Sequence, residues 1–312
     1  MCIRDRSATA LISGEPGVGK TSLSTEIAAL AHERGATVLY GRCDEDLHIA
    51  YQPFREALQD YLATQPRPII EALLARWTHL SRLAGPWAQR TEAVQSAGSD
   101  AEGERALLFE AVEGWLHELA LEGTVVLVID DVHWASGPTV QLLRHLSHQK
   151  WWPLLCIATF RDTDTTESTV LREMLAGVHR HVNIHRISLQ GLDRDGVAQL
   201  LETRAAQVLV ATDVRLAERI HDETGGNPFF ATMLVRHLLD TEPANGGRAV
   251  LPDAFQLPDG VRDIIRHRLE RLSPATNQVL RVAAAIGPIS PFALLSTVPL
   301  SGDTAGLLDA LD

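Results

Sequence analysis

The sequence predicts an α/β fold in which a parallel β-sheet carries helices on both faces and is followed by regions made of helices alone. Two observations support this prediction. Short apolar runs alternate with longer segments of helical periodicity from residue 7 to about residue 190, and this alternation is typical of βαβ units. After Leu189 the strand-like runs cease and only helical periodicity remains.

The first predicted strand is the apolar run Thr9–Ser13, which leads directly into the glycine-rich turn GEPGVGKT. A helix follows the turn, and Gly35 ends it, because glycine is common just past a helix C-terminus. The apolar face of this helix is formed by Leu23, Ile27, Leu30 and Ala31. The sequence therefore predicts a strand, a glycine turn and a helix in direct succession.

Four further strands are predicted from their residue types. Ala36–Tyr40 is rich in β-branched and aromatic residues, whereas Thr124–Ile129 and Leu154–Phe160 are continuous apolar runs of the kind found in buried parallel strands. Val182–Leu189 is a fifth, less regular strand. Pro138 is expected to begin a short helix at its first position.

The segment from Leu47 to about Ala120 reads as a helical insertion between the second and third strands. Its last helix has an apolar face at 3.6-residue spacing, made by Leu108, Val112, Trp115, Leu116 and Leu119. Within the insertion, Gln89–Gly103 is rich in Gly, Ser, Ala and acidic residues, and we expect an exposed loop there. This insertion, with the strands on either side, favours a sheet with an extra strand between the first and third.

The C-terminal third is predicted to be helical. Its elements are three helices, a polar linker and a further helical segment: Asp193–Ala206, Asp213–Glu223, Phe229–Leu239, the linker Asp240–Pro258, and the segment from Val261 to the end. We place domain boundaries near residues 190 and 250.

Composition excludes several classes of protein. The chain has 45% hydrophobic and 22% charged residues, as ordinary globular proteins do, and no apolar run approaches a membrane span or a secretory signal. A net charge of −12 argues against this segment gripping nucleic acid, because binding phosphates needs a basic face. The three cysteines (Cys2, Cys43 and Cys156) have no metal-ligand spacing, so we expect core thiols at Cys43 and Cys156 and a cytoplasmic location.

The two ends of the chain look non-native. Residues 1–6, MCIRDR, match the translation of a common sequencing-library adapter, and we leave them out of the fold prediction. The chain stops at Asp312 inside a predicted helix. We therefore expect a fragment of a longer protein.

The glycine-rich turn carries the strongest chemical signal. GEPGVGKT fits the phosphate-binding pattern G-x-x-x-x-G-K-[ST], in which backbone N–H groups surround the β-phosphate of a nucleotide. Lys20, one of only two lysines in the chain, would reach the β- and γ-phosphates, and the Thr21 hydroxyl would bind Mg²⁺. A chance glycine turn is the alternative. The residues expected to hold the nucleotide are Gly14, Glu15, Pro16, Gly17, Val18, Gly19, Lys20, Thr21 and Ser22.

Two acids follow the third strand in VVLVIDDVHW. Asp130 would lie at the carboxyl edge of the sheet, where it can hold Mg²⁺ directly or through water. Asp131 is then the candidate to polarise the attacking water. The alternative is a strand-ending turn without function. His133 could couple to Asp131 or to the nucleotide, although a histidine hydrogen-bonded within the loop is the simpler interpretation.

Two residues further along are candidates for sensing the nucleotide. Arg161 follows the fourth strand at the same edge of the sheet and could contact the γ-phosphate; a surface arginine at the start of a loop is the alternative. Pro228, in TGGNPFF, fixes a turn that could pack against the adenine ring. A generic helix terminator with an apolar anchor would have the same pattern.

Together these motifs resemble a known family. GEPGVGKTSL, YGRCDEDLHIAYQPF, VLVIDDVHWAS, ATFRDTD, LQGLDRDGV and TGGNPFF are similar to bacterial STAND ATPases, signal-transducing P-loop NTPases often described as Orc1-like AAA ATPase domains. Such domains occur in large LuxR-type transcription regulators and in multidomain adenylate cyclases. The resemblance covers residues from about 8 to about 290.

The resemblance implies a domain plan and a mode of action. Residues 7–190 would form the P-loop nucleotide-binding domain of an AAA-like sheet with its insertion at about 47–120, residues 191–250 a helical lid, and residues 251–312 the start of a winged-helix-like domain. Binding of ATP or ADP with Mg²⁺ would switch the protein between a closed ADP state and an open, often self-associating ATP state. Arg161 corresponds to the family's sensor arginine, and Pro228 to its lid proline.

Three functions are compatible with this interpretation. The first is a slow ATPase switch in a signal-responsive transcription regulator, with an inducer or partner protein acting through a C-terminal region outside this chain. The second is the same module in a nucleotide cyclase. The third is an initiator- or loader-type ATPase acting on DNA, which the acidic charge disfavours. We expect no membrane contact and no direct nucleic-acid contact from this segment.

Overall fold

The fold is described by a computed structural model, which places residues 7–45, 49–90, 101–148, 152–161, 172, 183–205, 214–241, 269 and 273–286. The described residues form two compact units. The first contains residues up to Gly191 together with Asn227–Phe229, and the second contains Leu192–Gly226 and the chain from Phe230 onward. The predicted adapter-derived residues 1–6 lie outside the described residues. The predicted linker Asp240–Pro258 was wrong at its start, because Asp240 and Thr241 belong to a helix that ends at Thr241, and the rest of the linker lies outside the described residues.

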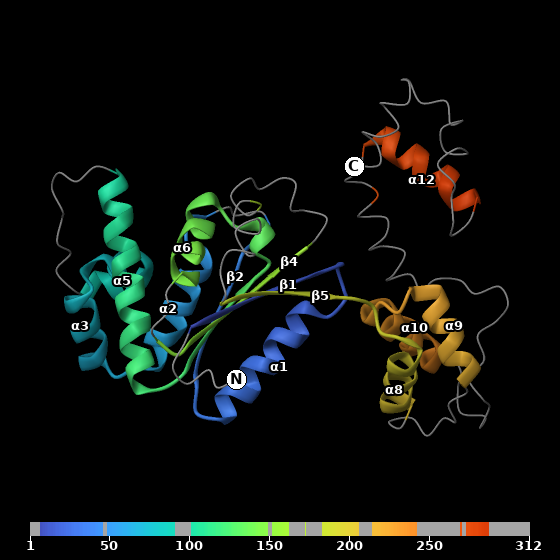
Figure 1. The fold of residues 1–312 in the computed structure, drawn as a ribbon, viewed down its shortest axis with the longest axis horizontal. Helices are drawn as coiled ribbons and strands as arrows, with labels where there is room; N and C mark the ends of the chain where they lie inside the picture. Colours follow the sequence, from blue (N-terminus) through green and yellow to red (C-terminus); the bar gives the residue numbers. More distant parts are fainter. Residues whose placement is uncertain are drawn as a thin grey trace. The chain divides into compact units, whose positions relative to one another are not determined.

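The first unit is built on a parallel five-stranded sheet (Figure 1). The strands are β1 Ala8–Gly14, β2 Thr37–Arg42, β3 Val125–Asp130, β4 Leu154–Phe160 and β5 Ile184–Leu189. Their order is β2-β3-β4-β1-β5, and every described pairing is parallel. β4 thus lies between β1 and β3, which confirms the extra strand predicted between the glycine turn and the acidic pair.

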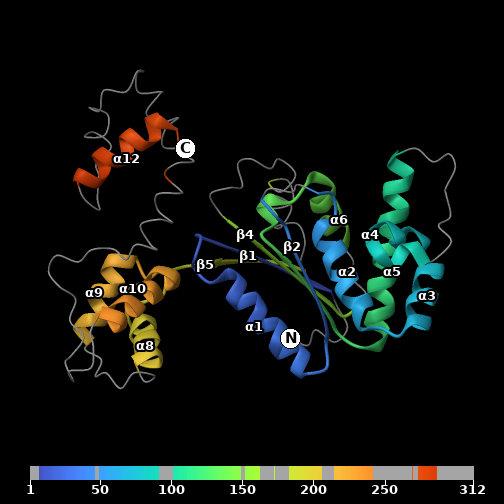
Figure 2. The same ribbon diagram turned by 180° about the vertical axis from the view of Figure 1, so that it is seen from behind.

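Helices cover both faces of this sheet, as Figures 1 and 2 show. The alternation of side chains along a strand sends successive residues of β3 into different cores. Leu127 packs in a large cluster with Trp115 of the helical insertion, whereas Val126 packs in a smaller cluster with Ala28 of α1 (Lys20–Glu33). Burial of all six β3 residues explains why this strand reads as a continuous apolar run.

The large cluster joins the strands of the sheet to the helical insertion and to the helix after β3. These helices are α2 Gln52–Thr64, α3 Arg67–Arg76, α4 Ser81–Ala84, α5 Ala101–Glu122 and α6 Gly137–Ser147, with short 3-10 helices at Thr78–Leu80, Gly85–Arg90 and Val132–Trp134. The five apolar residues predicted for the last insertion helix are all buried in α5.

Two local predictions were wrong at their boundaries. The predicted loop Gln89–Gly103 begins inside the 3-10 helix and ends inside α5, which starts at Ala101; residues 91–100 lie outside the described part. Glu102 and Glu104 lie in the first turn of α5, where negative charge is stabilised by the positive end of the helix dipole. This stabilisation offsets the low helix propensity of Gly103. Similarly, α6 begins at Gly137, so Pro138 occupies its second position.

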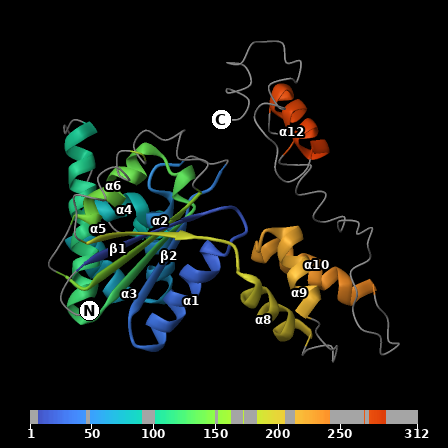
Figure 3. The ribbon, with the colours of Figure 1, turned by 45° about the vertical axis from the view of Figure 1, so that its right-hand side comes forward.

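The second unit contains the helices α8 Arg194–Ala205, α9 Val214–Thr224, most of α10 (Pro228–Thr241) and α12 Pro274–Ile286 (Figure 3). The first three share a small apolar core of Val197, Leu201, Leu216, Ala217, Ile220, Ala231, Leu234 and Val235. Of the predicted winged-helix-like segment, the structure describes little beyond α12, so that assignment stays a prediction. Among the described helices, none has the length and apolarity required to cross a membrane.

Candidate functional site

The glycine turn between β1 and α1 presents backbone rather than side chains. Gly17 and Gly19 have φ of 83° and 103°, values that favour glycine and that turn successive N–H groups toward one side of the loop. Among the described residues no side chain caps α1, and its first turn contains no acidic residue. The positive end of the helix is therefore left to attract an anion from outside the chain.

Lys20, the first residue of α1, folds back along this turn. Its Nζ donates to the carbonyl oxygens of Gly14 and Glu15, each at 2.9 Å, and the residue is 7% exposed. Thr21 and Ser22 are exposed on the first turn of α1, and Val18 is buried beneath the loop. The ammonium group is thus held by the loop whose N–H groups would bind phosphate.

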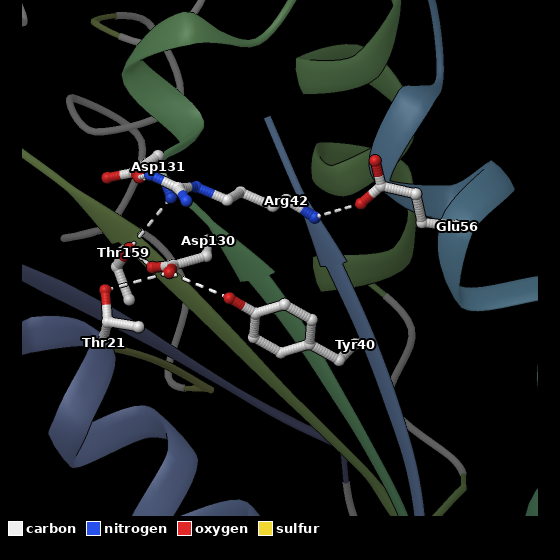
Figure 4. A network of polar contacts seen from close by, with 7 residues as sticks. All are labelled: Thr21, Tyr40, Arg42, Glu56, Asp130, Asp131 and Thr159. Carbon is white, nitrogen blue, oxygen red and sulfur yellow. Dashed lines mark hydrogen bonds and ion pairs between the residues drawn. The ribbon is translucent and has the colours of Figure 1, made fainter. Parts of the chain in front are cut away.

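Asp130, the last residue of β3, is the centre of a hydroxyl network (Figure 4). The residue is 1% exposed. Its Oδ2 accepts hydrogen bonds from Thr21 Oγ1 at 2.9 Å and from Tyr40 Oη at 3.0 Å, and its Oδ1 accepts one from Thr159. These donors satisfy a buried carboxylate that would otherwise be costly. The hydrogen bond joins Thr21 and Asp130, which are 109 positions apart in the sequence; their role as Mg²⁺ ligands stays a prediction.

Asp131 lies immediately beyond the strand in a different environment. Its φ of 58° and ψ of 44° are left-handed, a conformation that Asp tolerates better than most residues. Its backbone N–H donates to Thr159 Oγ1 at 3.0 Å, so one hydroxyl links the backbone of Asp131 to the carboxylate of Asp130. The left-handed turn therefore fixes the two adjacent acids in separate positions.

The carboxylate of Asp131 is paired with an arginine from the edge strand. Arg42 Nε and Nη2 lie 3.2 and 3.0 Å from its Oδ2. Both side chains are drawn in Figure 4. Burial raises the pKa of Asp131 above its ordinary value, and the charge of Asp130 adds to this rise, while the charges of Arg42 and Arg161 oppose it. A carboxylate with a raised pKa accepts a proton more readily than a surface aspartate.

Three residues of this network were missed by the sequence prediction: Tyr40, Arg42 and Thr159. β2 pairs with β3 in parallel register, with Arg42 beside Asp130, so Tyr40 and Arg42 reach the acids from the neighbouring strand. The backbone N–H of Arg42 also donates to Glu56 Oε2 at 2.8 Å. The sequence signal that could have found these residues is their position, because polar residues at the ends of parallel strands lie together at one edge of a sheet.

Tyr40 remains a hydrogen-bond donor in this site. Burial, the charge of Asp130 and the hydrogen bond to Asp130 raise the pKa of Tyr40 to about 12. At neutral pH its hydroxyl therefore keeps its proton and can only donate to the carboxylate.

Arg161 and His133 lie next to the indole of Trp134. The Arg161 guanidinium carbon is 4.6 Å from the centroid of the Trp134 ring, within the range of a cation–π contact. His133 is buried, and its ring centroid is 4.5 Å from that of Trp134. The charge of Arg161 also lowers the pKa of Asp131.

The predicted lid proline lies beside the glycine turn. Pro228 is the first residue of α10, and its two neighbours contact the loop: Asn227 Nδ2 donates to the Pro16 carbonyl at 3.0 Å, and the Phe229 N–H to the Gly17 carbonyl at 3.3 Å. Asn227–Phe229 belong to the same compact unit as the sheet. Contact of Pro228 with adenine stays a prediction.

The oxygen-rich donor set fits a magnesium nucleotide. Thr21 and Asp130 offer a hydroxyl and a carboxylate 2.9 Å apart at the start of α1. Mg²⁺ prefers such hard oxygen ligands and takes few from the protein, with phosphate and water supplying the rest. A Cβ built at Gly19 meets no described atom within 4 Å, so the turn leaves room for phosphate.

One similar solved structure agrees with the fold. The Walker-type ATPase paby2304 of Pyrococcus abyssi aligns over 97% of this chain and 83% of its own, at 18% identity and a TM-score of 0.59. Thermotoga maritima RuvB, a Holliday junction branch migration motor, aligns over 97% and 80% at 17% identity, with a TM-score of only 0.41. No curated protein sequence matches the chain.

A family model for the AAA ATPase domain matches residues 2–157, half of the 312 residues. The match spans the glycine turn, the helical insertion and the acidic pair, and it ends within β4. On this match, the chain belongs to the AAA ATPase domain family.

Proposed function

We propose that this chain is an ATP-dependent regulatory switch module that binds Mg·ATP between the glycine turn and Asp130 and hydrolyses it slowly. The observation that carries the proposal is the hydrogen bond between Thr21 and Asp130. It joins the start of the phosphate-binding helix to the acidic end of β3, which is the pairing a magnesium nucleotide needs.

Each residue has a proposed role in the bound state. Backbone N–H groups of residues 15–20 surround the β-phosphate, and Lys20 leaves the two carbonyl groups to meet the β- and γ-phosphates. Thr21 and Asp130 would hold Mg²⁺, which neutralises charge on the phosphate oxygens. Arg161, displaced from Trp134, would contact the γ-phosphate.

Hydrolysis requires Asp131 to face the attacking water. The water oxygen bonds to the γ-phosphorus, the bond to the ADP oxygen breaks, and Asp131 accepts the proton that the water loses. In the structure both contacts from Arg42 go to Oδ2 of Asp131, so the ion pair competes with the attacking water for this carboxylate. We expect slow turnover, which suits a switch better than a motor.

Nucleotide binding can be tested by calorimetry with ATP and with ADP in the presence of Mg²⁺. Lys20→Ala should abolish binding, because it removes the only side-chain cation of the turn. Lys150→Ala, the same substitution at the other lysine of the chain, is the matched control and should bind as the wild type does. Equal affinity of the wild type and Lys20→Ala would refute the site.

The resemblance to STAND ATPases supports a role in a signal-responsive transcription regulator, with self-association in the ATP state. Sedimentation in ATP and in ADP tests the self-association. The complete gene tests the context: a helix-turn-helix domain beyond residue 312 supports the regulator, and a cyclase catalytic domain there contradicts it.

A further inference from the structure

The side chain of Asn227 makes two hydrogen bonds, one as an acceptor and one as a donor. Its Oδ1 accepts from the Phe229 backbone N–H at 3.1 Å, and its Nδ2 donates to the carbonyl of Pro16 in the glycine turn at 3.0 Å. The residue is 7% exposed, so both bonds are shielded from water. The side chain therefore joins two segments that are 211 positions apart in the sequence.

The first of these bonds is a helix cap. α10 begins at Pro228, so Phe229 is its second residue, and an N-cap side chain accepts a hydrogen bond from the N–H of the second or third residue. Proline at the first position has no N–H to satisfy. An aspartate would serve equally well as a cap, but it has no donor for the Pro16 carbonyl. An amide at this position does both.

The glycine turn also contacts the start of α10 through Gly17. The Gly17 carbonyl accepts from the Phe229 N–H at 3.3 Å, so this N–H is shared between Gly17 and Asn227. A Cβ on Gly17 would lie 2.9 Å from the Phe229 Cβ, closer than real Cβ contacts allow, and 3.0 Å from the Asn227 Oδ1, which is tighter than most real contacts. Glycine at 17 thus permits the approach as well as the positive φ.

We propose that Asn227 is a positioning residue that couples nucleotide occupancy of the glycine turn to the order of the first turn of α10. Phosphate binding needs residues 15–20 in one conformation, and the bond to Pro16 restricts that loop before the ligand arrives, which lowers the entropic cost of binding. By thermodynamic reciprocity, a bound nucleotide must then stabilise the Asn227 cap. The inference rests on the proposed nucleotide site.

The coupling has a route along the chain. α10 begins in the unit that contains the sheet and continues from Phe230 as part of the second unit. If the first turn of α10 becomes more or less ordered, the effect therefore arises at the start of a helix whose remaining residues pack in one core with α8 and α9.

Asn227→Asp separates the two bonds, because it keeps the capping oxygen and removes the donor to Pro16. The measurements are ADP affinity with Mg²⁺ and hydrogen exchange of the amides of residues 229–232, with and without ADP. In the wild type, ADP should slow exchange in these amides. Asn227→Asp should bind ADP about fivefold more weakly, the loss expected for one hydrogen bond, and ADP should no longer slow this exchange.

Asp193→Ala is the matched control, because Asp193 caps α8 through the Gly196 N–H at 2.8 Å. It removes a cap of the same kind from a neighbouring helix and should leave both the affinity and the exchange response unchanged. If Asn227→Asp does not fold, Asn227→Ser tests the same point, since its hydroxyl can cap α10 but is too short to reach Pro16.

The outcomes distinguish this inference from the proposed function. A wild type that binds no nucleotide refutes the proposed function and the inference together. If the wild type binds ADP and Asn227→Asp shows the same affinity and the same exchange response, the inference alone is refuted. An Asp193→Ala variant that loses the response as well would show a general effect of lid stability and would also overturn the inference.

Discussion

The two sides of the proposed nucleotide site are built in different ways. On the side of β1 and α1, consecutive residues of one turn supply backbone N–H groups, one lysine and one hydroxyl. On the side of β2 and β3, the groups are side chains from separate segments, held by mutual hydrogen bonds around Asp130 and by the pair between Arg42 and Asp131. The first side is suited to binding, and the second to control of the chemistry.

Within the side of β2 and β3, the two acids are held with different firmness. Asp130 is buried under three hydroxyl donors, whereas the Arg42 side chain is 60% exposed and that of Asp131 13% exposed. An ion pair with one partner in solvent contributes little free energy, typically about 1 kcal/mol or less. The Arg42–Asp131 pair can therefore open at small cost, while the Asp130 network persists.

The largest effect is expected where β2 is held against the insertion. A Cβ at Gly41 would lie 1.9 Å from the carbonyl oxygen of Pro53 in α2, so Gly41→Ala must displace the strand that carries Tyr40 and Arg42. We expect a loss of about 3 kcal/mol in the free energy of unfolding, measured by urea denaturation. Gly137→Ala, whose Cβ meets no described atom within 4 Å, is the control and should not destabilise the protein.

The next effect concerns the hydroxyl that links the two acids. Thr159→Val removes the donor to Asp130 and leaves the partly buried N–H of Asp131 without its acceptor. The expected loss is about 2 kcal/mol of stability, together with slower hydrolysis. Thr159→Ser keeps the hydroxyl and should retain most of the stability and most of the hydrolysis rate. Equal behaviour of the Val and Ser variants would show that the hydroxyl is not needed.

Arg42→Ala tests the pair through the pH dependence of hydrolysis. Asp131 must be unprotonated to accept a proton, so the rate falls as the pH drops through its pKa. Arg42 lowers that pKa, so its removal should move the acid limb of the rate profile to higher pH. Arg42→Lys keeps the charge and should shift less. An unchanged acid limb would exclude Asp131, or its pairing, from the rate.

The smallest effect is expected at Tyr40, which is 38% exposed. Tyr40→Phe removes one of the three donors to Asp130 and leaves Thr21 and Thr159 in place. The loss of stability should be about 1 kcal/mol or less in thermal unfolding. A loss as large as that of Thr159→Val would show that the edge strand holds Asp130 as firmly as β4 does.

The same contrast explains what the sequence could predict. The order of strands and helices, the extra strand and the glycine turn follow from local periodicity and from one contiguous motif. Asp130 and Asp131 follow from their place after an apolar run. Tyr40 and Arg42 could not be found in this way, because their role depends on the register between β2 and β3, which local sequence does not encode.

Asn227 shows the same limit in the C-terminal part. Its sequence context predicts a turn before a helix, but its donor reaches a loop more than 200 positions earlier. The predicted start of the helix at Phe229 was one residue late, because Pro228 occupies its first position. Contacts between distant segments are decided by packing, and a single sequence carries little information about them.

The division between binding and chemistry is tested most directly by measuring ATP affinity and the single-turnover rate of hydrolysis in Asp131→Asn. The substitution keeps the size of the side chain and removes the proton acceptor. The account predicts unchanged affinity for Mg·ATP and a rate reduced about 100-fold or more. Loss of affinity in step with the rate, or an undiminished rate, would contradict it.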